Sequence, residues 1–308
     1  MYLRQPLPLP VNSSPGMIVH RNNSRSKSEN TAYIAEIIKL ILKYKSHVEN
    51  NELNEQSTGQ LAGSHLCMNQ YKNIFRKYRR PDKHRDIQIT RSSSYFMILS
   101  NGIFYRPVQD DIESQIHWIL SEKSQPDKTP LFTTCDRREW SRYYNLLRKG
   151  RPLSFRVGTS RVTSSVLRRR NKCLSEQNKD LFNEIEGAAF LICLDKNENY
   201  EIDVEQFLHG GKMNYYNRWY DSTLQFIIND RGDFGLSYEH SVCEGIPIVN
   251  MAQQIKKTLK NFKTKDRYYF GMTPVSSRNF KLSSELTSAL LVAEHNILNL
   301  QSNLGQVQ

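Results

Sequence analysis

The sequence lacks several features that would place it in a specialised class of protein. No apolar run approaches the roughly 18 residues that a transmembrane helix needs, and the first residues have no apolar core of a signal peptide. The five cysteines are scattered and form no Cys-x-x-Cys pair, so neither a zinc site nor a disulfide framework is predicted. No internal repeat is visible. We therefore expect a cytoplasmic protein with reduced cysteines and no metal.

Acidic residues are scarce in two stretches of the chain. The sequence has 43 Lys and Arg against 31 Asp and Glu, a formal net charge of +12, and residues 148–172 hold nine basic residues and no acid. A shorter basic cluster spans 76–85. Such patches can bind nucleic acid, so a basic nucleic-acid-binding protein is one alternative. Because residues 154–170 show little apolar periodicity and no interleaved aromatic platform, the segment at about 151–175 is predicted to be a flexible insert.

Apolar periodicity in the rest of the chain predicts both helices and strands. Spacing of three and four residues predicts helices over 31–50, 66–79, 111–121, 137–149, 248–262 and 283–300. Apolar runs predict strands over 188–194, 224–229 and 234–240, with a strand-like stretch at 131–135. Ser100-Asn101-Gly102 predicts the turn of a hairpin over 94–108. This mixture favours one α/β domain over 1–308, with a mixed β-sheet flanked by helices.

The stretch GLSYEHSVCEGIPIV, residues 235–249, places charged groups where a buried strand ends. His240 follows an alternating apolar run, Glu239 precedes it, and Glu244 comes four residues later. A carboxylate near an imidazole orients the ring and stabilises its protonated form, as general-base catalysis requires. A histidine at a strand end is also common as an ordinary core residue. The residues alone therefore indicate a candidate base and name no substrate.

Two other motifs carry weaker signals. His209-Gly210-Gly211 is typical of a tight turn or an anion-binding nest. Residues 195–206 resemble a calcium loop, but Tyr200 stands where the loop needs glycine and Gln206 where it needs glutamate. We therefore predict no metal at this loop.

Several stretches together resemble the choline/carnitine acyltransferases, in the order in which that family has them. They are YLRQPLPLPVNSSPG at 2–16, GQLAGSHLCMNQY at 59–71, FLICLD at 190–195, FLHGG at 207–211, and NRWYDSTLQFIINDRGDFGLSYEHSVCEGIPIV at 217–249. The resemblance extends over nearly the whole chain except the basic segment. Each stretch alone is unspecific, and the combination is highly specific.

The resemblance implies an enzyme of two related α/β domains, with a tunnel between them. Such an enzyme moves an acyl group between coenzyme A and the hydroxyl of carnitine or choline. It implies that His240 is the general base, that Glu244 orients the imidazole and shapes the field around the ammonium substrate, and that Tyr2 lines the alcohol pocket. Acetyl-coenzyme A is then a co-substrate, and no cofactor is bound permanently. The resemblance matches only the N-terminal half, so the coenzyme A-binding residues and the residue that separates choline from carnitine are expected beyond 308.

Two departures from the family leave alternatives open. The triple glycine of the family reads Gly210-Gly211-Lys212 here, and the basic segment has no counterpart. A catalytically inactive fragment or paralogue of the same fold is therefore a second alternative, and it predicts an exposed apolar face where the other domain would dock. A carnitine-type enzyme would also allow a mitochondrial or peroxisomal location.

Overall fold

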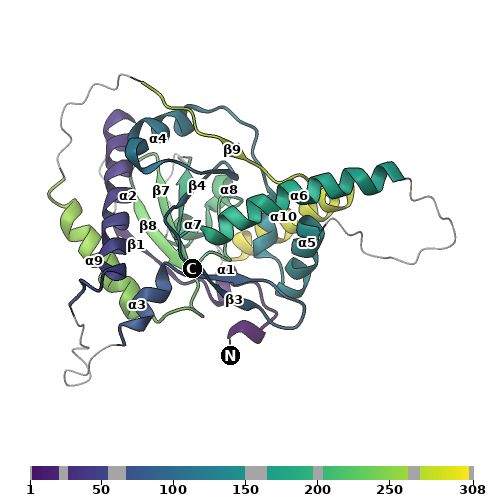
Figure 1. Cartoon of the computed structure of the whole chain (residues 1–308), viewed down its shortest axis with the longest axis horizontal. Coiled ribbons are helices and arrows are strands. Elements are labelled where there is room, and N and C mark those ends of the chain that lie inside the picture. The colour runs from purple at the N-terminus through teal and green to yellow at the C-terminus, as the bar shows by residue number, and fades with distance from the viewer. Residues whose placement is uncertain are drawn as a thin grey trace.

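The computed structural model has a mixed β-sheet between two groups of helices (Figure 1). It describes residues 2–20, 27–54, 67–149, 165–196, 204–262 and 271–304. Within these residues the main sheet has seven strands in the order β1-β8-β7-β6-β4-β5-β9. Their bounds are β1 Gly16–His20, β4 Met97–Ser100, β5 Ile103–Tyr105, β6 Leu191–Asp195, β7 Leu224–Asn229, β8 Phe234–Tyr238 and β9 Ser277–Arg278. The expected α/β class with a mixed sheet flanked by helices is confirmed.

The helices and a second small sheet complete the described part of the chain. The sheet pairs β2 Lys77–Arg80 with β3 Ile87–Thr90. The α-helices are α1 Leu9–Asn12, α2 Lys27–Glu49, α3 Asn69–Ile74, α4 Ile112–Ser121, α5 Arg137–Lys149, α6 Ser165–Gly187, α7 Val204–His209, α8 Gly211–Asn214, α9 Gly245–Leu259 and α10 Ser284–Leu304. The short 3-10 helices are η1 Tyr2–Arg4, η2 Gln109–Asp111 and η3 Thr129–Thr134.

Two hydrophobic cores lie on opposite faces of the sheet. Ile192 and Leu194 of β6 join the core formed with α2, α4 and α9. Leu191 and Cys193, which alternate with them, join the core formed with α5, α6, α10 and η3. Figure 1 shows α2 and α9 on one side of the strands and α5, α6 and α10 on the other. Burial on both faces explains why β6 reads as a continuous apolar run.

The directions of the strands decide where the candidate site lies. Strands β4, β6 and β7 are parallel. Strand β8 runs antiparallel to β7 and pairs Tyr238 with Leu224, the first residue of β7. The end of β8 therefore lies at the amino-terminal ends of the parallel strands, whereas ligands of open α/β sheets commonly bind at the carboxyl-terminal ends.

The hairpin between β4 and β5 is confirmed, and it turns as its sequence predicts. Asn101 and Gly102 have φ of 55° and 74°, both in the left-handed region that a tight hairpin turn requires. The helix expected over 66–79 is shorter: α3 ends at Ile74, and Lys77 already begins β2.

The strand expected at 131–135 is wrong, because residues 131–134 lie in the 3-10 helix η3 and Cys135 follows its end. Pro130 stands at the start of η3, where its fixed φ suits a helical turn. The hydroxyls of Thr133 and Thr134 donate to the carbonyl oxygens of Pro130 and Leu131 at 2.8 and 2.7 Å. These local bonds offer the backbone an alternative to strand pairing.

The basic segment at 151–175 is only partly described. Residues 151–164 lie outside the described ranges, and from Ser165 the backbone is part of α6. The calcium-like loop lies largely outside them too, since 197–203 are not described. None of the helices in the described ranges combines the length and the hydropathy needed to cross a membrane.

Candidate active site

The candidate base lies where β8 leaves the sheet beside the chain that enters β1. The backbone N–H of Tyr238 donates to the carbonyl of Pro15 at 3.0 Å, and that of His240 donates to Ser13 at 2.9 Å. Gly16 begins β1, and a Cβ there would lie 2.7 Å from the Leu236 carbonyl oxygen, so only glycine allows this close approach. Main-chain hydrogen bonds to the segment before β1 therefore place His240.

The imidazole of His240 is half-buried and is held by the loop that follows it. Its Nδ1 lies 3.2 Å from the carbonyl oxygen of Cys243. A carbonyl oxygen only accepts hydrogen bonds, so we infer that Nδ1 carries the proton and that the lone pair is on Nε2. The ring also lies edge-on to Tyr238, with centroids 5.9 Å apart. This tautomer is the one that a general base acting through Nε2 requires.

The loop after His240 is held by two glutamines from other elements. Gln88 of β3 donates through Nε2 to the carbonyl of Ser241 at 2.7 Å. Gln70 of α3 accepts at 3.2 Å from the backbone N–H of Glu244, through its Oε1. Helix α9 then begins at Gly245. The turn that carries the Cys243 carbonyl is thus fixed at both ends.

The two carboxylates of the motif lie in different surroundings. Glu239 is 1% exposed, and its Oε1 lies 2.6 Å from the Nη1 of Arg79. The hydroxyl of Ser241 donates to its other oxygen. Glu244 stands at the N-cap position of α9, and its exposed side chain makes no capping hydrogen bond. The structure thus separates a buried carboxylate beside the base from an exposed carboxylate at the helix start.

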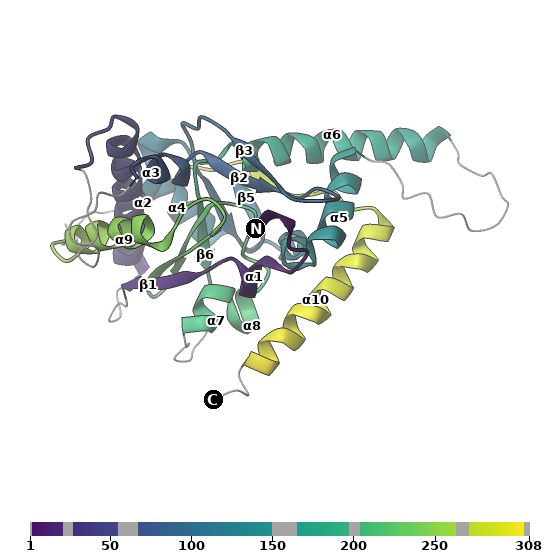
Figure 2. The ribbon, with the colours of Figure 1, turned by 90° about the horizontal axis from the view of Figure 1, so that it is seen from below.

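Tyr2 begins η1, and its side chain lies outside the described part of the structure. The backbone near Tyr2 is hydrogen-bonded to two other parts of the chain. The carbonyl of Leu3 accepts from the backbone N–H of Asp86 at 2.9 Å, and the carbonyl of Pro6 accepts from Arg137 at 2.7 Å. Figure 2 shows this N-terminal segment lying beside α5. Local sequence predicts none of these contacts.

Arg79 was missed as a site residue because its sequence context suggested a basic surface cluster. It is 1% exposed and pairs with Asp86 and Glu239, which are 7 and 160 residues away in the sequence. Its neighbour Arg80 donates to Glu186 at 3.1 Å. No local pattern reports a partner so distant. Two charges of the basic cluster at 76–85 are therefore neutralised within the fold.

Cys243 lies close to the base, but its thiol is a poor nucleophile. Burial, with the nearby charges of Glu239 and Glu244, raises the pKa of the Cys243 thiol to about 12. The thiolate is the nucleophilic form of cysteine, and at neutral pH this group stays protonated. Cys243 is therefore disfavoured as a nucleophile at this site.

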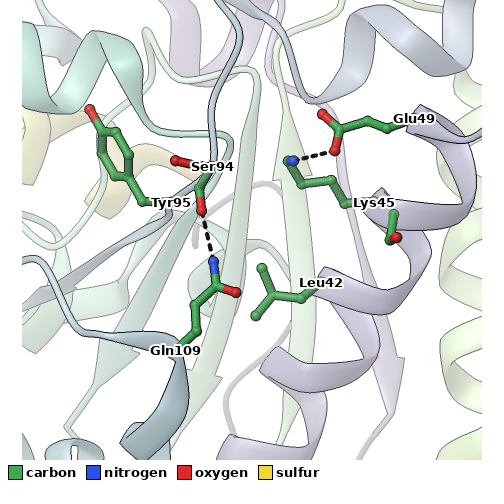
Figure 3. Close-up of a pocket in the computed structure, with 7 residues that line it drawn as sticks. Leu42, Lys45, Glu49, Ser94, Tyr95 and Gln109 are labelled. Atoms are coloured by element: carbon green, nitrogen blue, oxygen red, sulfur yellow. Dashed lines mark hydrogen bonds and ion pairs between the residues drawn. The ribbon is translucent and has the colours of Figure 1, made fainter.

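A cavity of about 190 Å³ lies apart from this site, between α2 and the chain that enters β4 (Figure 3). On the α2 side, the Nζ of Lys45 lies 2.6 Å from a carboxylate oxygen of Glu49. On the other side, Gln109 donates to the Ser94 carbonyl at 2.7 Å. These polar groups on the cavity wall already bond to one another in pairs, and we assign the cavity no ligand. Among the described residues, no three His, Cys, Asp or Glu side chains are grouped as a metal site requires.

Comparison with known proteins gives matches along nearly the full chain. The model of the choline/carnitine O-acyltransferase family matches residues 1–156 and 152–306. A choline O-acetyltransferase of Danio rerio is 30% identical over 292 residues, which cover 86% of this chain and 42% of that protein. A carnitine O-acetyltransferase of Columba livia is 28% identical over 322 residues, which cover 96% of this chain and 47% of that protein. The chain thus spans less than half the length of these two relatives.

Proposed function

Since this chain belongs to the choline/carnitine O-acyltransferase family, we propose that it supplies the general base for moving an acetyl group between coenzyme A and the hydroxyl of choline or carnitine. One observation carries the proposal. Nδ1 of His240 faces the Cys243 carbonyl, in a half-buried ring at the end of β8, and this contact favours the tautomer with its lone pair on Nε2, the nitrogen that acts as the base in this proposal. Both relatives described above are named as O-acetyltransferases, which supports this reaction class.

The transfer proceeds through proton movement at one nitrogen. Nε2 of His240 accepts the proton of the alcohol while the alcohol oxygen attacks the thioester carbonyl carbon. A tetrahedral oxyanion forms and collapses, the carbon–sulfur bond breaks, and the departing sulfur takes the proton back from Nε2. In the reverse direction the base takes the proton from the coenzyme A thiol. Coenzyme A is a co-substrate in this scheme, and no permanently bound cofactor takes part.

Glu244 and Tyr2 act on the alcohol substrate in this proposal. Because the imidazole Nδ1 faces a main-chain carbonyl, Glu244 contributes chiefly through the charge of its exposed carboxylate, which attracts the quaternary ammonium group. Tyr2 offers an aromatic face to the same group, an attraction of about 0.5–2 kcal/mol. Both roles predict a larger effect on the KM of choline or carnitine than on the KM of acetyl-coenzyme A.

The test is acetyl transfer to choline and to carnitine in parallel, measured as thiol release, for the chain and its His240→Ala variant. We expect the variant to lose on the order of 10²–10⁴ in kcat, the usual contribution of a general base. The matched control is His295→Ala, because His295 is exposed on α10 and contacts Asn299. The proposal fails if His240→Ala keeps the wild-type rate. A folded wild-type chain that turns over neither alcohol would favour the inactive alternative.

A further inference from the structure

A chain of buried ion pairs begins at the residue before the candidate base. Oε1 of Glu239 lies 2.6 Å from Nη1 of Arg79, and Nε of Arg79 lies 2.6 Å from Oδ2 of Asp86. The same Asp86 oxygen lies 2.7 Å from Nε of Arg137, whose Nη1 lies 2.6 Å from Asp221. All five side chains are at most 3% exposed. They alternate in charge, so each charge is compensated by its neighbours.

This ion-pair chain holds both main-chain segments that bracket His240. Nη1 of Arg79 donates to the hydroxyl of Ser13 at 3.2 Å, and Ser13 in turn lies 3.4 Å from Glu239 Oε1. The carbonyl of Ser13 accepts the backbone N–H of His240 at 2.9 Å. The guanidinium of Arg79 therefore contacts Glu239, which precedes His240 in the sequence, and Ser13, whose carbonyl accepts the backbone N–H of His240.

Stability alone is a weak reason for such an arrangement. Burying ions is costly, and well-packed apolar residues in the place of a buried ion pair are often neutral or stabilising. Fixed orientation is what a planar, multiply bonded guanidinium adds. Here the orientation matters because the imidazole reaches the Cys243 carbonyl only if residues 239–243 keep the same backbone conformation.

We propose that Arg79 is a positioning residue for His240. Its guanidinium, held in place by Asp86, fixes Glu239 and Ser13 and so keeps the imidazole turned with Nδ1 toward the Cys243 carbonyl. The inference rests on the proposed function, in that it takes His240 as the base. Arg79 itself touches no substrate in this scheme.

The test reads the imidazole directly and needs no turnover. The chain is produced with ¹⁵N-labelled histidine, the His240 signals are assigned with His240→Gln, and long-range ¹H–¹⁵N correlation reports the two tautomers. We expect the Nδ1–H form to dominate in the wild type. In Arg79→Lys the ratio of Nδ1–H to Nε2–H should fall by about tenfold, the effect of losing one hydrogen bond of ordinary strength. Lysine keeps the charge and loses the fork that reaches several partners.

Two further variants decide the outcome. Arg218→Lys is the matched control, because Arg218 is also buried and makes two bonds to one carboxylate, that of Asp195. It should leave the tautomer ratio unchanged. Glu239→Gln keeps the shape of the side chain, and it should lower the ratio even if Arg79→Lys does not fold. The proposal is overturned if folded Arg79→Lys or Glu239→Gln keeps the wild-type ratio, or if Arg218→Lys lowers the ratio as much.

The same spectra separate the two proposals. A wild-type chain without turnover, whose tautomer ratio still falls in Arg79→Lys, would contradict the proposed function and support the positioning role. A wild-type chain with turnover, whose tautomer ratio is unchanged in Arg79→Lys, would support the proposed function and contradict the positioning role. Where turnover is measured, a positioning residue should lower kcat while leaving both KM values near those of the wild type.

Discussion

Replacing Gly102 with alanine tests the hairpin that ends β4. Gly102 has φ of 74°, and a non-glycine residue in the left-handed region costs about 1–2 kcal/mol. An added Cβ would also lie 1.7 Å from the carbonyl oxygen of Asp127, far inside any real contact. The turn and the 127 segment must therefore separate.

That separation breaks two hydrogen bonds, each worth about 1 kcal/mol. One joins the N–H of Asp127 to the carbonyl of Asn101, and the other joins the N–H of Gly102 to Oδ1 of Asn217, both at 3.1 Å. Together with the backbone cost, we expect Gly102→Ala to lower the free energy of unfolding by about 3–4 kcal/mol.

Urea denaturation followed by circular dichroism measures this loss, with Gly271→Ala as the matched control. A Cβ at Gly271 would meet no atom within 4 Å, so the control should be neutral or stabilise by up to about 1 kcal/mol. The reasoning is refuted if the free energy of unfolding of Gly102→Ala lies within about 0.5 kcal/mol of the wild-type value, a difference typical of ordinary surface positions.

Three further predictions concern stability. Burial, followed by the charge of Arg218, lowers the pKa of His209 from 6.5 to about 4. Below pH 6.5 the imidazole of the unfolded chain is protonated, whereas that of the folded chain stays neutral until about pH 4. The free energy of unfolding should therefore fall by up to about 3 kcal/mol between pH 6.5 and 4. His209→Gln should remove that slope in a pH series of urea melts, and an unchanged slope would contradict the assignment. Arg218→Met leaves Asp195 buried without its partner and should cost about 3–5 kcal/mol, while adding Asp195→Leu should recover most of it; a single variant as stable as the wild type would exclude this. Ile297→Ala, at 5% exposure, should cost about 2–5 kcal/mol, whereas Leu291→Ala on the same helix, at 64% exposure, should change stability by less than about 0.5 kcal/mol; equal losses would contradict the packing of α10.

The elements that sequence predicts well are those whose signal is local. Strand β6 is a run of apolar residues because both of its faces are buried, and the turn at Asn101-Gly102 needs only the backbone freedom of two residues. Strand β1 was missed because five residues after Pro15 carry too short a pattern, and their place in the sheet depends on pairing with β8, more than 200 residues later. The prediction of a strand at 131–135 was wrong because its signal was local and misleading. Threonine and phenylalanine favour strands, but here the threonine hydroxyls bond to nearby backbone carbonyls within a 3-10 helix.

The candidate site divides in the same way. His240, Glu239 and Glu244 lie within five residues of one another, and their residue types alone suggest a base with carboxylates. The contacts that give the ring its tautomer and its place involve the Cys243 main chain and Arg79, and neither is visible in a pattern of residue types. Whether Glu244 and Tyr2 act on the substrate as proposed stays a prediction.

The contact between His240 and Cys243 is made by a backbone oxygen, and this has a consequence for how the site can vary among related sequences. Since no side-chain atom of residue 243 takes part in the contact, different small residues can stand at position 243 while the imidazole keeps its partner. The number of residues between the two positions has no such freedom. One residue inserted or deleted between 240 and 243 would move the carbonyl away from the ring. Related sequences should therefore tolerate substitutions at position 243 but not insertions or deletions between the two positions.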